Sequence, residues 1–501
     1  MSLASSHSPV ASAAPRAEGR VRWLTPLAIF AVLAAAAGVQ AWGGLNLDVA
    51  WFMTFAERTL QGARAYVDVS DPNPPAAVLV YLPAMALSRW TGLKAEALVV
   101  AQTLALASAA VWFVARLEEG AARRFRIVVA GMTALTIVPA ACFAEREHYA
   151  AMAALVAAAA MVALGRGRPL APMARFVAGC AAGAATAFKP HFAFAFAAPL
   201  LYATALRRTL RWLAWREIAG FAGVLAIYAA VALVFYPDYF AVALPDALEV
   251  YAALREPLTA AFASATTWFM LAIVAAALAV ARGGALSAGS AGAALASVGF
   301  AFAYFAQFRF QLNHASPAIE LATIPLLEFL MANATGRLAP RALAATLVVL
   351  APLFLRAQAL FAQTMGAPAV VAAARDLLPP DGRIGAVADS MELTFPAARH
   401  IGGTWVNRYN SLWRANTARA LLEHGRPDAE KSTRLRAEIA SDRRQLAEDF
   451  STGRPDLIIV ESAAIRLRET TAPELAAIFA DYRLATVVDG VELWTRRAPP
   501  R

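Results

Sequence analysis

Four short polar groups interrupt otherwise apolar sequence, and their side chains could support acid–base and phosphate chemistry. Asp48 follows the first apolar run, and Glu145-Arg146-Glu147-His148, Lys189-Pro190-His191 and Arg309-Phe310-Gln311-Leu312-Asn313-His314 stand between later ones. A carboxylate can take a proton from a hydroxyl, whereas Lys and Arg can hold a phosphate and stabilise developing negative charge. These types of residue therefore predict a polar reaction site, provided that the fold gathers them.

Asp48 opens a polar loop that also contains Arg58, Tyr66, Asp68 and Asp71. An ionisable group near lipid is costly, so a carboxylate at the mouth of a helical bundle is a candidate functional group. Two structural interpretations remain open. Asp48 could cap the helix that follows it, because Asp is a favoured N-cap. Asp68 and Asp71 could only form a turn before a proline.

The other three groups also have structural interpretations. Glu145 to His148 could be a solvated turn with ion pairs, Lys189 could extend to the membrane interface, and Asn313-His314 could be a loop that starts a helix. Together His148, His191 and His314 with a glutamate are suitable metal ligands, but no single group has metal-ligand spacing. We therefore predict no metal site and no certain cofactor, and leave a divalent metal open.

The elements that must position these groups are membrane helices. The chain has 501 residues, of which 60% are hydrophobic and 16% charged, and its mean hydropathy is +0.53. Such a composition excludes an ordinary soluble protein. The net charge of +10 does not indicate nucleic acid, because the arginines cluster in short loops between apolar runs. Cys142 and Cys180 stand in or beside apolar runs, so no disulfide framework is expected.

The apolar runs predict about eleven spanning helices of about 17–25 residues each. Residues 74–87 are also apolar, but about fourteen residues rise only ~21 Å and Pro83 weakens the helix. We interpret them as an interfacial helix. The predicted spans are 24–42, 95–115, 127–143, 149–164, 172–188, 190–206, 218–236, 262–281, 290–307, 315–333 and 340–360.

The distribution of positive charge predicts the orientation. With the N-terminus inside and 74–87 not spanning, about seventeen positive residues fall in inside loops and about eight in outside loops. All four polar groups then lie on the outer face of a bacterial inner membrane. We expect residues 1–22 to be a disordered cytoplasmic tail, 23–362 to form the membrane domain with an outer loop at 43–94, and 363–501 to form a periplasmic domain.

The last part of the chain is more charged and predicts a small α/β domain. Strands are expected at 383–388 and 457–460, a helical stretch at 428–450, and a hairpin over 482–494 that turns at Asp489-Gly490. An aromatic cluster around Phe395, Trp405 and Trp413 favours a packing role. No P-loop, nucleophile elbow or zinc signature is present.

The order of these features resembles the C-type glycosyltransferases, the membrane family that includes protein O-mannosyltransferases and the aminoarabinose transferase of lipid A. The likeness rests on Asp48 just after the first span, Tyr66, the Pro74-Pro75 start of the interfacial helix, and the charged turn with Glu145 and Glu147. It also rests on the small-residue helix from Gly183 that ends in Lys189-Pro190. It covers about residues 24–210 well and the later spans loosely.

The resemblance implies an inverting transfer of a sugar from a polyprenyl-phosphate donor to a lipid, glycan or protein acceptor on the outer face. It implies Asp48 as the base or acceptor-orienting carboxylate. Lys189, with Arg58 or Arg146, would bind the donor phosphate. The second acidic position of the family appears here as Glu145 and Glu147, and either could serve.

Three other functions remain open. A transporter or lipid flippase would show repeated halves with matching broken helices, and no such repeat is detected. An O-antigen ligase or polymerase would carry a large late loop, whereas here the first loop is long. A scaffold that presents the outer domain would leave the polar groups without a role.

Overall fold

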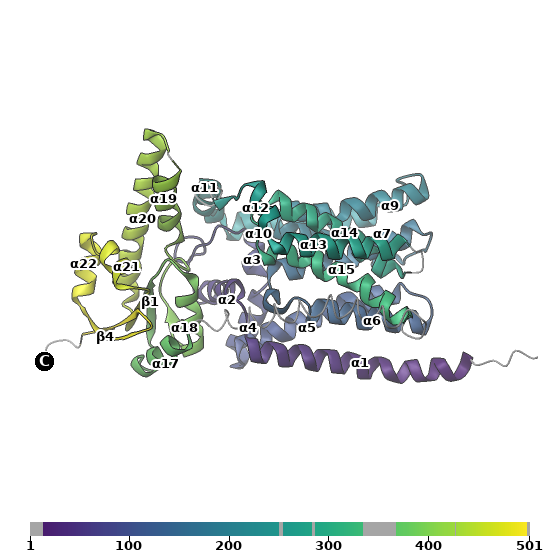
Figure 1. Ribbon diagram of the computed structural model, residues 1–501, viewed down its shortest axis with the longest axis horizontal. Helices are drawn as coiled ribbons and strands as arrows, with labels where there is room; N and C mark the ends of the chain where they lie inside the picture. Colours follow the sequence, from purple (N-terminus) through teal and green to yellow (C-terminus); the bar gives the residue numbers. More distant parts are fainter. Residues whose placement is uncertain (1–13, 250–253, 283–285, 334–366, 426, 498–501) are drawn as a thin grey trace, which may run out of the picture.

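The computed structural model describes residues 14–249, 254–282, 286–333, 367–425 and 427–497. A helical bundle makes up most of the molecule, and a small α/β domain lies beyond one end of it (Figure 1). Helix α1 (Ala14–Gly43) begins inside the segment that we expected to be a disordered tail. The span predicted at 340–360 falls outside the described residues.

The bundle is built from long apolar helices, as the sequence predicted. The bundle helices after α1 are α5 (Ala95–Arg116), α6 (Ala121–Thr136), α7 (Arg146–Gly165), α8 (Pro172–Phe188), α9 (Ala197–Arg207), α10 (Trp215–Phe235), α13 (Ala265–Arg282), α14 (Ala288–Ala306) and α15 (Leu312–Asn333). In the described part of the chain, six helices are long and apolar enough to cross a membrane, namely α5, α7, α10, α13, α14 and α15. Helix α7 is the central one, because it packs against α5, α8, α9, α14 and α15.

Helices α8 and α10 approach closely because glycines face each other across their contact. A Cβ on Gly179 would lie 2.2 Å from the carbonyl oxygen of Glu217, and one on Gly220 would lie 2.4 Å from that of Phe176. Small residues allow such close approach between membrane helices. The chain leaves α8 through η2 (Pro190–Phe196), which continues into α9.

The loop between α1 and α5 is folded into short helices. Helix α2 (Leu47–Leu60) is followed by α3 (Ala76–Leu79) and α4 (Leu82–Thr91), which ends at Gly92 with a left-handed φ of 73°. Ten helical residues rise only ~15 Å, so residues 74–87 do not form a spanning helix, as predicted. Between α10 and α13 lie η3 (Tyr239–Ala243), α11 (Leu244–Glu249) and α12 (Leu258–Ala263).

The C-terminal domain contains a five-stranded sheet in the order β2-β1-β3-β5-β4. Strand β1 pairs in parallel with β2 and β3, and β5 pairs antiparallel with β3 and β4. The predicted hairpin is confirmed: Asp489 and Gly490 both have positive φ, 51° and 82°, as a two-residue hairpin turn requires. The strands are β1 (Arg383–Val387), β2 (Thr404–Trp405), β3 (Leu457–Val460), β4 (Tyr482–Val488) and β5 (Val491–Arg496).

Helices of the C-terminal domain surround this sheet. They are α17 (Pro368–Leu377), α18 (Phe395–Ile401), α19 (Trp413–His424), α20 (Ala429–Gly453), α21 (Ala463–Glu469) and α22 (Pro473–Ala480). The predicted charged helical stretch corresponds to α20. Strand β2 was not predicted, because its two residues are too few to show the alternation of apolar and polar side chains that indicates a strand.

The two parts of the molecule meet at α2, which lies between the bundle and the C-terminal domain (Figure 1). The Arg399 guanidinium on α18 forms ion pairs with Glu57 at 3.0 Å and Glu96 at 2.8 Å. The rings of Phe395 and Trp51 lie 5.2 Å apart, so the predicted packing role of Phe395 includes a contact with α2. These contacts place the C-terminal domain directly over the loop that carries Asp48.

Candidate functional site

Asp48 lies in the first turn of α2 with its carboxylate available for contacts beyond its own helix. The N-cap is Asn46, whose side chain accepts a hydrogen bond from the Val49 amide at 2.9 Å. The capping interpretation of Asp48 is therefore wrong. Its Oδ2 lies 3.5 Å from Nη2 of Arg146 and also accepts a long hydrogen bond, 3.5 Å, from Nδ2 of Asn313.

Arg146 and Glu147 form the start of α7, at the centre of this cluster. The Arg146 Nε lies 3.6 Å from Oε2 of Glu147, and its guanidinium stacks over Phe52 at 4.5 Å from the ring centroid. A carboxylate in the first turn of a helix is stabilised by the helix dipole. The Arg146 Nη1 has no hydrogen-bond partner among the described residues although it is buried.

Lys189 reaches the same place from the end of α8. It is extended, with φ −150° and ψ 126°, because the following Pro190 disfavours a helical conformation. Its Nζ donates to Oε1 of Glu147 at 2.5 Å and to Oε1 of Gln307 at 3.0 Å. An ammonium group has three N–H donors, so two of them are engaged and one remains for a ligand.

The exposure of these groups differs in a way that suits a reaction site. The Asp48 side chain is 35% exposed, whereas those of Arg146 and Glu147 are 5% and 0% exposed. A substrate can therefore reach Asp48. The buried groups behind it are held in place by one another, which fixes their geometry before a ligand arrives.

Glu145 joins the cluster through Asn46, whose side-chain amide donates to one carboxylate oxygen. Burial raises the pKa of Glu145 well above its ordinary value, and the neighbouring Asp48 and Glu147 raise it further. Burial and the two neighbouring carboxylates thus stabilise the protonated form of Glu145 relative to a free carboxyl group, whereas Glu147 is paired with two cations. Neighbouring glutamates in the sequence occupy different environments in the structure.

Three predicted site residues do not join the cluster around Asp48 and form hydrogen bonds with other parts of the chain instead. The Arg58 Nη1 donates to the carbonyl of Asn407, in the C-terminal domain, at 2.5 Å. The Tyr66 hydroxyl donates to the carbonyl of Asn73 at 3.0 Å within the first loop. The His148 ring is fully buried, where Nε2 lies 2.7 Å from the carbonyl of Leu135. The structure brings none of these three into contact with Asp48.

The other two histidines predicted as site residues, His191 and His314, lie at the edge of the cluster. The Nδ1 of His314 lies 2.7 Å from the Arg309 carbonyl, and His191 packs edge-on against Phe192 at 5.0 Å. Within the ranges that the structure describes, no three His, Cys, Asp or Glu side chains are grouped to hold a metal ion.

Sequence reasoning missed some residues that hold the site together. Asn46 and Gln307 were not predicted, although an Asn two residues before Asp48 is a recognisable cap signal. Asp71 does form the predicted turn, because Oδ1 accepts from the Asn73 amide at 2.8 Å. It also accepts from Nε1 of Trp51 at 2.9 Å. Burial raises the pKa of Asp71.

Comparison with solved structures finds a protein with a similar architecture. The chain superimposes on the apo crystal structure of ArnT from Cupriavidus metallidurans, an aminoarabinose transferase, with a TM-score of 0.51 and 12% sequence identity. The match covers 94% of this chain and 99% of the other. This chain has the C-type glycosyltransferase fold.

The fold expected from the sequence resemblance is thereby confirmed, including a polytopic helical part with a C-terminal domain. No protein-family model matches the sequence, and no curated protein has significant sequence similarity to it. At 12% identity the likeness to ArnT concerns the fold. The activity has to be argued from the site itself.

Proposed function

We propose that this protein is a glycosyltransferase that moves a sugar from a polyprenyl-phosphate donor to an acceptor at the periplasmic face of a bacterial inner membrane. The observation that carries the proposal is the continuous network from Asp48 through Arg146 and Glu147 to Lys189. It places a reachable carboxylate beside two cations that each retain an uncommitted N–H donor. The fold shared with ArnT supports the same conclusion.

The reaction follows from the chemistry of these groups. An acceptor hydroxyl oxygen attacks the anomeric carbon while its proton passes to the Asp48 carboxylate. The bond between that carbon and the phosphate oxygen breaks, and the electron pair leaves with polyprenyl phosphate, so the configuration inverts. Arg146 and Lys189 stabilise the negative charge that develops on the leaving phosphate. Glu147 orients both cations.

Replacing Asp48 with Asn tests the proposal, because the amide keeps the shape but cannot accept the proton. We expect kcat for transfer from polyprenyl-phosphate-linked glucose, mannose or aminoarabinose to fall at least about 100-fold, with normal membrane insertion. Asp68→Asn is the matched control, because Asp68 lies in the same loop and accepts from the Arg64 backbone amide. Full activity in the Asp48 variant would refute the assignment of the base.

A further inference from the structure

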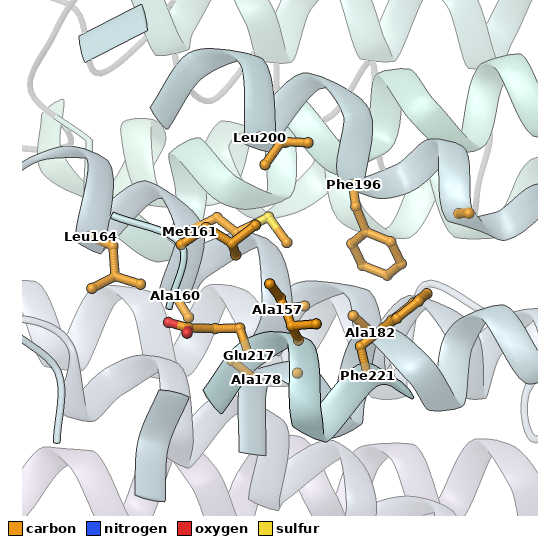
Figure 2. Close-up of a pocket in the computed structure, with 14 residues that line it drawn as sticks. Ala157, Ala160, Met161, Leu164, Ala178, Ala182, Phe196, Leu200, Glu217 and Phe221 are labelled. Carbon is orange, nitrogen blue, oxygen red and sulfur yellow. The ribbon is translucent and has the colours of Figure 1, made fainter. Parts of the chain in front are cut away.

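A second hollow lies within the bundle, away from the polar cluster. It has a volume of about 290 Å³ and is lined by α7, α8, α9, α10 and η2. Its walls are apolar apart from Glu217, and Figure 2 shows Leu164 and Glu217 near one end and Phe196 and Phe221 near the other. The hollow is thus an elongated apolar slot with one polar end.

This slot is separate from the proposed active site. Leu164 lies eighteen residues beyond Arg146 on α7, which corresponds to ~27 Å along the helix. Helices α7 and α10 are both long and apolar enough to span a membrane. The polar end of the slot therefore lies near the opposite end of the bundle from Asp48.

Basic residues of α8 and α9 contact residues at that polar end. The Arg207 Nε donates to the carbonyl of Leu164 at 2.9 Å, so its guanidinium lies beside a wall residue of the slot. Arg175 forms an ion pair with Glu217 and thereby neutralises the only carboxylate in the wall. Arg208 and Arg211 follow Arg207 in the stretch that leads to Leu213, which also lines the slot, and both are exposed with no side-chain partner among the described residues. This end of the slot is consequently positive, and it is followed in the chain by two exposed guanidinium groups.

We propose that the slot binds an acyl chain of an anionic phospholipid from the inner leaflet, with the lipid phosphate held by Arg207, Arg208 and Arg211. An apolar slot at membrane depth suits an alkyl chain, and a rim of arginines attracts anionic headgroups of the cytoplasmic leaflet. This site does not depend on the proposed transfer reaction. The bound lipid would join α7, α8 and α10 at the end of the bundle opposite the C-terminal domain.

Native mass spectrometry of the full chain tests the headgroup contact. The protein is released from nanodiscs that contain phosphatidylcholine and phosphatidylglycerol in equal amounts. We expect selective retention of phosphatidylglycerol by the wild type. Arg208→Gln and Arg211→Gln should each reduce that retention roughly fivefold. Arg282→Gln, an exposed arginine at the end of α13, is the matched control and should change nothing.

A second pair of variants tests the slot. Ile218 lines it and Ile227 does not, and both are exposed on α10, at 53% and 68%. Ile218→Trp should reduce retention by obstructing the slot, whereas Ile227→Trp should not. Equal retention of the two phospholipids, or insensitivity to both the arginine and Ile218 changes, would refute the proposal. Selective retention of added polyprenyl phosphate instead would assign the slot to a different lipid and would also refute it.

Discussion

Arg146 is the residue on which the polar cluster depends. Its guanidinium lies within 3.5 Å of Asp48 and 3.6 Å of Glu147, and it packs over Phe52 at the same time. A planar group with five donors can serve several acceptors in a fixed geometry, which a single ammonium cannot do. The position of Asp48 relative to Lys189 is therefore set largely by this one side chain.

Arg146→Lys is expected to keep the positive charge and lose the geometry. The lysine cannot contact both carboxylates and a phosphate, so kcat should fall on the order of 100-fold. Steady-state kinetics with the donor held at saturation measures the effect. Arg116→Lys, at the end of α5, is the control. Unchanged kcat for Arg146→Lys would mean that only the charge matters at this position.

Lys189 has a structural and a proposed functional role, and a double variant separates them. Lys189→Met removes the closest cation from the fully buried Glu147, which should lower the free energy of unfolding by about 3 kcal/mol. Lys189→Met with Glu147→Gln removes both charges and should recover most of that stability. Thermal unfolding in detergent measures the first effect.

Donor kinetics then measures the proposed functional role of Lys189, which is to bind the donor phosphate. Because Lys189 is proposed to hold the phosphate, the stabilised double variant should still use the donor poorly. Recovery of both stability and donor use would show that Lys189 only neutralises Glu147.

At the scale of residues, the sequence predicted which side chains belong to the site better than it predicted which side chains contact each other. Asp48, Arg146, Glu147, Lys189 and Asn313 were all candidates, and the structure joins them. Arg58 looked equivalent in the sequence because it is a cation in the same loop as Asp48. It differs because it lies ten residues further along α2, almost three helical turns away, where the C-terminal domain is its neighbour.

At the scale of elements, the contact between α8 and α10 positions Lys189 and forms a wall of the lipid slot. Helix α8 delivers Lys189 at its end, and its glycine face fixes how deeply the helix sits against α10. The sequence predicted both helices from their apolar length. It could not predict their separation, because the same small residues also occur on surfaces that pack against nothing close.

Gly220→Ala tests this contact. The added Cβ would lie 2.4 Å from the Phe176 carbonyl oxygen, so the helices must separate, at a cost of about 1–3 kcal/mol. We expect a lower Tm in detergent. Gly223→Ala is a control on the same helix, because a Cβ there meets nothing within 4 Å. Equal Tm values for the two variants would contradict the close packing.

At the scale of the whole molecule, the C-terminal domain holds the loop that carries the proposed base. Arg399 connects α18 to both α2 and α5, and Trp51 of α2 packs on Phe395. The sequence predicted the α/β composition and the hairpin of this domain from local patterns. Its placement over α2 depends on contacts between residues more than three hundred positions apart, which no local pattern reveals.

Arg399→Ala should loosen this contact. We expect faster hydrogen exchange in α2 and a several-fold lower kcat, because α2 positions Asp48. Arg434→Ala is the control, since Arg434 is 59% exposed and pairs with Glu430 on its own helix. If α2 exchanges at the wild-type rate in the Arg399 variant, the domain does not hold the loop through this residue.

The segment after β2 contacts the first loop through its main chain. The carbonyl of Asn407 accepts from Arg58, and the carbonyl of Arg408 accepts from the Ser70 amide at 2.9 Å. Carbonyl groups are the same whichever side chains accompany them. In related chains, the side chain at 408, which here pairs with Glu448 and Asp449 on α20, can therefore change while the docking of the two domains stays the same. Position 407 is less free, because the buried Asn407 side chain also hydrogen-bonds the Ala386 backbone.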